Sequence, residues 1–117
     1  MSVTIPRAEV AAELRRAIAG EVPVVCLSDL DWYDFNLTFR IGDWKISFFI
    51  DAGDLDYVDA AVAPDGRRAE FDDWANEPPE ELLDPLDELS MENQRAIASI
   101  LETASKAGGV TVGVAGE

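Results

Sequence analysis

The 117-residue chain contains no histidine and only one cysteine, Cys26. The absence of histidine excludes Ser-His-Asp and Cys-His nucleophile arrangements, imidazole metal ligands and the commonest general base. A single cysteine cannot form an intrachain disulfide, and it leaves too few ligands for a zinc site. Cys26 lies in the apolar run VPVVCL, so we predict that it is a buried packing residue.

Several targeting and binding signals are also missing. The chain has no run of about 18 apolar residues that would cross a membrane. Its N-terminus lacks the basic-then-apolar order of a secretory signal. No glycine-rich phosphate loop precedes a predicted helix. We therefore predict one domain over residues 1–117, in the cytoplasm, with no cofactor and no membrane association.

Basic residues are scarce. Nine lysines and arginines face 24 aspartates and glutamates, which gives a formal net charge of −15. Residues 29–88 hold 18 of the acidic residues but only four of the basic ones. A field of this sign repels polyanions, which argues against direct binding to nucleic acid or to an anionic membrane. It favours a basic partner, such as a cation or an electropositive protein surface. The alternative is that the charge only maintains solubility.

Residues 35–50, FNLTFRIGDWKISFFI, predict the hairpin around which the chain packs. A two-residue turn at Gly42 and Asp43 would have type II′ geometry, with positive φ at the glycine. The turn and the apolar alternation specify the same register. In this register eight apolar side chains share one face, in the cross-strand pairs Ile41–Trp44, Phe39–Ile46, Leu37–Phe48 and Phe35–Ile50.

The other predicted elements surround this hairpin. Apolar residues at helical spacing and helix-end signals predict helices over residues 5–20, capped by Thr4, and over residues 91–107, capped by Ser90. Further strands are predicted over residues 22–27, 55–63 and 67–71, and a proline-rich acidic loop with a helical turn at 79–83 over residues 72–89. The predicted fold is α+β, a four- to five-stranded antiparallel meander with the N-terminal and C-terminal helices on one face, and with residues 110–117 as a loose tail.

A candidate partner-binding site combines aromatic residues with carboxylates. Trp32 and Tyr33 lie in SDLDWYDF, where they are predicted either to anchor a partner or to cover the edge of the core. The predicted charged surround consists of Asp29, Asp31, Asp34, Asp51, Asp54, Asp56 and Asp59.

Two other chemistries compete with partner binding. The acidic rim DAGDLDYVD, from Asp51 to Asp59, offers oxygen ligands for Ca²⁺ or Mg²⁺, but it lacks the spacing of an EF-hand loop. A pair of carboxylates can perform acid–base catalysis, yet in so acidic a chain any chosen pair is weak support. A divalent-cation module and a small carboxylate-based enzyme therefore stand as alternatives.

The blocks LDYVD, APDGR and FDDW, within residues 42–74, resemble the central segment of a family of small, acidic, uncharacterised bacterial domains. In that family they follow a leading helix and a hairpin, and precede a P-x-x-LL loop and a final helix. The resemblance implies this architecture and no catalytic residue.

The function that these features favour is that of a non-enzymatic acidic protein, a monomer or homodimer, which blocks an electropositive surface of another protein. By analogy of charge and size, the candidates are a DNA mimic that inhibits a defence nuclease complex and a toxin-neutralising immunity protein.

Overall fold

The computed structural model describes residues 5–28, 32–33, 35–79 and 81–106. Within them a five-stranded antiparallel sheet has the order β1-β2-β3-β4-β5, so neighbours in sequence are neighbours in the sheet. The strands are β1 (Val24–Cys26), β2 (Asn36–Ile41), β3 (Trp44–Asp51), β4 (Asp54–Val62) and β5 (Arg68–Glu70). The helices are α1 (Arg7–Ile18), α2 (Phe71–Ala75), the 3-10 helix η1 (Pro85–Glu88) and α3 (Met91–Lys106).

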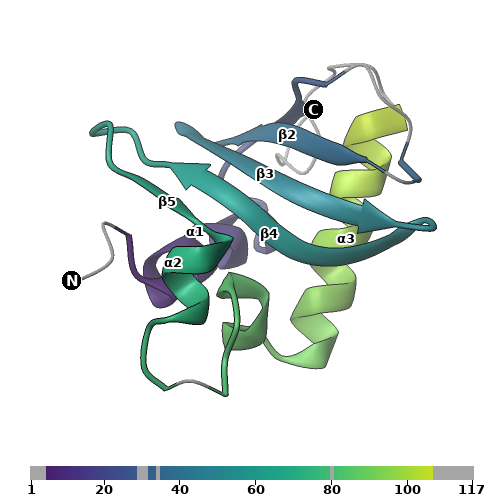
Figure 1. Cartoon of the computed structure of the whole chain (residues 1–117). Helices are drawn as coiled ribbons and strands as arrows, with labels where there is room; N and C mark the ends of the chain where they lie inside the picture. The colour runs from purple at the N-terminus through teal and green to yellow at the C-terminus, as the bar shows by residue number, and fades with distance from the viewer. Residues whose placement is uncertain (1–4, 29–31, 34, 80, 107–117) are drawn as a thin grey trace.

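The predicted α+β meander is confirmed. α1 and α3 lie together on one side of the sheet, as Figure 1 shows, and the core fills the space between these helices and the sheet. No described helix is both long and apolar enough to cross a bilayer. No helix of the described residues covers the opposite side of the sheet across β2 and β3, and we call this side the open face.

The predicted hairpin register is confirmed over β2 and β3, where Ile41, Phe39 and Leu37 pair with Trp44, Ile46 and Phe48. All six side chains are buried. Gly42 has φ +59° and Asp43 has no positive φ, as a type II′ turn requires. Phe35 keeps the predicted position opposite Ile50, whose N donates to the Phe35 carbonyl oxygen at 3.0 Å. It precedes β2, however, and its side chain is 46% exposed, so it does not join the other apolar residues in the core.

Strand β4 departs from the strict alternation that its sequence predicts. Phe48 pairs with Val58 while Ser47 pairs with Ala60, so the register passes over Asp59. A second irregularity passes over Asp56. Strict alternation predicts Tyr57 on the same face as Leu55 and Ala61, and Val58 on the other face. Each extra residue reverses the alternation, so this prediction was wrong. Val58 is buried in the core, whereas Tyr57 pairs with Phe49 and stacks on its ring on the open face.

Several predicted boundaries also change. β1 covers only part of residues 22–27, and the last predicted strand ends at Glu70, where α2 begins. Part of the predicted acidic loop forms α2 and η1, and Pro85 begins η1 instead of breaking a helix. The predicted cap of α3 is confirmed, because Ser90 Oγ accepts a hydrogen bond from Asn93 N at 3.1 Å. Thr4 and residues 110–117 lie outside the described residues.

Arg7, at the start of α1, fastens the segment from α2 to η1 to the helical layer. Its side chain is fully buried. The guanidinium donates to the carbonyl oxygens of Trp74, Glu77, Pro79 and Leu82, and it pairs with the Glu88 carboxylate at 3.4 Å. Buried charge is tolerated only when it is paired and hydrogen-bonded, and these contacts meet that condition. The sequence signalled none of them.

Candidate functional site

The aromatic pair of the predicted site packs against the turn between β3 and β4. Trp32 Nε1 donates to the carbonyl oxygen of Gly53 at 2.9 Å, and Gly53 N donates to the carbonyl oxygen of Tyr33 at 2.8 Å. Ala52 and Gly53 both have positive φ, +52° and +86°, as a two-residue type I′ turn requires. Residues about twenty positions apart in the sequence are thus held together at one end of the sheet.

The two rings have different environments. Trp32 is half-buried against the core, so its ring covers the edge of the core and its indole N–H is used within the fold. Tyr33 is 57% exposed beside the turn. Tyr33 is therefore available to anchor a partner, whereas Trp32 mainly positions the segment that carries it. Of the predicted site, Asp29, Asp31 and Asp34 lie outside the described residues.

Three exposed carboxylates gather at the same turn. Asp51 and Asp54 flank it and are direct cross-strand partners, and Asp56 follows two residues later. Among the described residues, none of the three is joined to a cation or to a hydrogen-bond donor. Like charges directly opposite each other generally destabilise a strand pair, and no ion pair with a described residue compensates the Asp51–Asp54 pair.

Asp59 differs from these three residues. It is half-buried, and its carboxylate accepts a hydrogen bond from Asn36 Nδ2 at 3.4 Å across β3. We define the acidic end as Tyr33, Asp51, Asp54 and Asp56, which the structure places around one turn. Asp59 lies farther along β4 and is not part of it. In the described part of the chain, no group of three or more Asp, Glu, Cys or His side chains is arranged to hold a metal ion.

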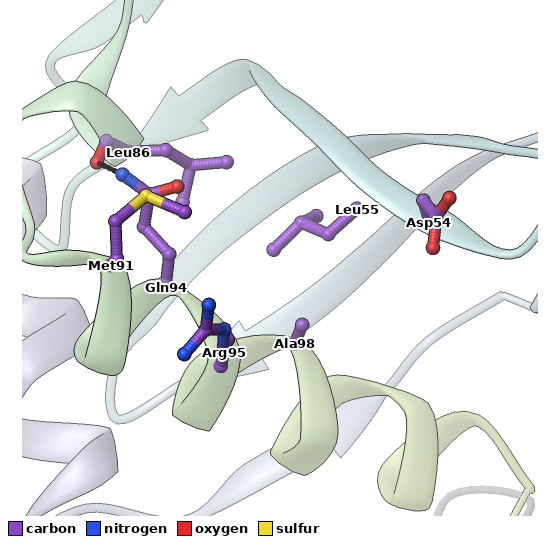
Figure 2. Close-up of a pocket in the computed structure, with 7 residues that line it drawn as sticks. All are labelled: Asp54, Leu55, Leu86, Met91, Gln94, Arg95 and Ala98. Atoms are coloured by element: carbon purple, nitrogen blue, oxygen red, sulfur yellow. Dashed lines mark hydrogen bonds between the residues drawn. The ribbon is translucent and has the colours of Figure 1, made fainter.

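A shallow pocket of about 280 Å³ adjoins the acidic end on the helical side of the sheet. Figure 2 shows Leu55 pointing into it from β4, between Asp54 on one side and Met91 on the other. Gln94 is held by hydrogen bonds from its Nε2 to the carbonyl oxygens of Leu86 and Leu89. The lining consists of Asp54, Leu55, Leu86, Met91, Gln94, Arg95 and Ala98.

Apolar and charged groups are separated in this pocket. Leu55, Leu86 and Met91 form an aliphatic wall, and Met91 is 63% exposed. Asp54 and Arg95 place opposite charges at its rim, and Arg95 forms no ion pair with any described residue. The lining of the pocket suits an aliphatic group with a polar or charged neighbour.

Asp84, a buried carboxyl that the sequence did not single out, lies between β4 and η1. Asp84 is 4% exposed, and its Oδ2 accepts hydrogen bonds from Val58 N at 2.8 Å and Leu86 N at 3.3 Å. Burial raises the pKa of Asp84 to about 6, and the negative charges of Asp87 and Asp56 add to this effect. A raised pKa is a feature of acid–base catalysts. Asp84 does not line the pocket, however, and its hydrogen bonds satisfy backbone at the sheet edge, so its role is structural.

Arg67, Arg40 and Lys45 lie away from the acidic end. Arg67 pairs with Glu9 and Asp65, which lowers the pKa of both carboxyls. Arg40 and Lys45 lie directly opposite each other at the other end of β3, and no ion pair with a described residue involves either. The acidic end thus forms no ion pair with a described residue, and it is separated from Arg40 and Lys45 along the strand direction.

The fold and these surfaces define a small α+β domain with exposed carboxylates and an exposed tyrosine ring. The chain belongs to a family described as a domain of unknown function, DUF7693, whose model matches residues 4–103. The resemblance to a family of uncharacterised domains is confirmed in that form. No curated protein and no solved structure matches the chain.

Proposed function

We propose that the protein is a non-enzymatic binding module whose acidic end docks onto an electropositive surface of another protein and blocks it. The observation that carries this proposal is the Asp51–Asp54 pair, which no described residue compensates, beside the exposed ring of Tyr33. A lysine or arginine from a partner would relieve the repulsion between the two carboxylates. The fold bears this cost before binding, so the relief adds to affinity.

The neighbouring features suit a protein partner. Tyrosine rings supply much of the binding energy at interfaces, and Tyr33 projects next to the carboxylates. The pocket beside Asp54 would take an aliphatic side chain of the same partner. A partner contacting both features would combine an apolar anchor with charge pairing, which gives specificity that charge alone does not provide.

The net charge of −15 would act at longer range. It would steer a basic partner toward the acidic end and make association fast and sensitive to salt. The finer assignments are an inhibitor that imitates the charge of DNA toward a defence nuclease complex, and an immunity protein that neutralises a toxin. Both rest on charge and size, and both place the partner's basic surface against the acidic end.

Protection of a sheet edge is the competing explanation for these carboxylates. β5 pairs only with Ala60–Val62, so the first half of β4 is a strand edge, and charged side chains on an edge discourage strand addition. The two explanations predict different effects when the carboxylates are substituted. An edge guard predicts aggregation when the carboxylates are replaced by neutral residues, whereas a docking site predicts loss of a partner when their charge is reversed.

Affinity capture from the native host, with mass spectrometry of the eluted proteins, tests the proposal. The bait variants are D51K/D54K and the matched control D43K/D72K, which makes the same change in net charge with exposed aspartates elsewhere. We expect a basic protein that wild type and the control retain at low salt, that high salt releases, and that D51K/D54K fails to retain. Equal retention by all three baits would refute the proposal.

A further inference from the structure

The open face of the sheet presents ordered rows of side chains, and the proposed function uses only the carboxylates at one end of this face. The first row is basic. Arg40 pairs with Lys45, Lys45 with Val62, and Val62 with Arg68, so one row crosses four strands and holds three of the nine cations in the chain. Arg68 pairs with Glu70 at 3.5 Å, whereas Arg40 and Lys45 form no ion pair with described residues.

Moving along β3 toward the acidic end, the face changes character. The second row holds the small residues Thr38, Ser47 and Ala60 on β2 to β4, and it ends at Glu70 on β5. The third row carries the stacked rings of Phe49 and Tyr57, whose centroids are 5.2 Å apart. The alternation of β3 then places Asp51 on the same face, opposite Asp54. Along β3 the open face thus runs from Lys45, through Ser47 and Phe49, to Asp51.

We propose that this face binds a second copy of the chain across a two-fold axis. The axis lies in the plane between the two facing sheets, runs perpendicular to the strands and is level with Phe48. It brings Lys45 of each copy to Asp51 of the other and Phe49 of each copy over Ser47 of the other. Both contacts occur twice, because a two-fold interface is self-complementary.

Two independent properties support a second copy as the occupant. The first is charge, since each end of the face carries an uncompensated like-charge pair, Arg40–Lys45 or Asp51–Asp54, and the ends have opposite signs. The second is size, because the bulky aromatic row of one copy meets the small row of the other. An acidic partner protein would satisfy the basic row and leave the acidic pair exposed, whereas a second copy satisfies both.

The dimensions predict a weak dimer. Four strands and the length from Lys45 to Asp51 make a patch of about 20 Å by about 20 Å, or about 400 Å² on each copy. Stable interfaces bury about 800 Å² on each partner. The two copies also repel each other through their net charge, which physiological salt screens over about 8 Å. Association should therefore be reversible, and stronger at moderate than at very low ionic strength.

Sedimentation equilibrium of the full chain, up to about 1 mM at moderate salt, tests the proposal. We expect a monomer–dimer equilibrium. K45E places two carboxylates in each contact and D51K places two cations there, so either variant should dimerise at least about tenfold more weakly. Both positions are exposed, so folding should be retained. D51K lowers the net repulsion, and weaker dimerisation by this variant cannot be attributed to overall charge.

Mixing the two variants supplies the decisive comparison. In a heterodimer of K45E with D51K, the introduced glutamate of one copy faces the introduced lysine of the other. The remaining contact pairs the native Asp51 with the native Lys45, so both contacts regain opposite charges. We expect the mixture, and the double variant K45E/D51K alone, to recover wild-type dimerisation.

Two results would overturn the proposal. One is a wild type that stays monomeric at every concentration, and the other is a mixture that associates no better than its components. K45E leaves the acidic end intact, so failure of dimerisation is distinct from failure of partner binding.

Discussion

Replacement of Asp84 by asparagine tests how the acidic segment is attached to the sheet. Burial raises the pKa of Asp84 from its ordinary value of 3.8 to about 6, although the N–H groups of Val58 and Leu86 oppose the change. Asparagine is nearly isosteric, and its carbonyl oxygen can accept the same two hydrogen bonds. The substitution therefore removes the ionisation of residue 84 and keeps most of its contacts.

The sign of the effect follows from proton linkage. Between pH 3.8 and about 6 the folded protein holds a proton on Asp84 that the unfolded chain has released. The free energy of unfolding therefore falls as the pH rises through this window. Above the window, the protein carries the full cost of burying the ionised Asp84 carboxylate. Each pH unit between the two pKa values is worth about 1.4 kcal/mol, so the cost reaches at most about 3 kcal/mol at neutral pH.

Urea denaturation of wild type and D84N at about pH 4 and about pH 7.5 measures this cost. We expect the two proteins to have similar stability at the lower pH, and D84N to gain up to about 3 kcal/mol on wild type at the higher pH. D43N, an exposed aspartate in the hairpin turn, serves as the control and should show no comparable gain. If D84N loses stability relative to wild type as the pH rises, the buried carboxylate is favourable and the reasoning is wrong.

Two further predictions concern the fold. R7M should lower the free energy of unfolding by about 3–5 kcal/mol, because it leaves buried carbonyl groups without donors. R15M removes one exposed hydrogen bond and should lower the free energy of unfolding far less. Equal losses of the two variants in urea denaturation would contradict the role given to Arg7. G42A should cost at least about 1 kcal/mol more than G66A. Both glycines have positive φ, but a Cβ at Gly42 would lie 2.5 Å from Glu13 Oε2, whereas a Cβ at Gly66 would meet nothing within 4 Å. If G42A and G66A lower the unfolding temperature equally, the contact with Glu13 has no effect.

The hairpin was predictable because two local signals agree. The Gly42–Asp43 turn and the apolar alternation independently specify one register, and a slip by one residue would expose the core. β4 lacked such agreement. Its sequence allows a regular strand, and only pairing with β3 makes Asp56 and Asp59 the extra residues. Bulges arise from the fit between strands, which the pattern of one strand does not contain.

The candidate site was predictable only in part. The sequence singled out Tyr33 and the aspartates near residue 54, and the structure places Tyr33, Asp51, Asp54 and Asp56 around one turn. The pocket beside them needs side chains from β4, η1 and α3, which are distant in the sequence. The cross-strand rows of the open face likewise depend on register across four strands, so composition could not reveal them.

The most direct test of the proposed docking is the association rate of the purified partner with the protein as a function of ionic strength. The account predicts a rate constant that falls steeply as salt rises for wild type and D43K/D72K. For D51K/D54K it predicts a rate constant that is lower at low salt and nearly independent of salt. If the control variant flattens the salt dependence as much as D51K/D54K does, association depends on overall charge, and the acidic end has no special role.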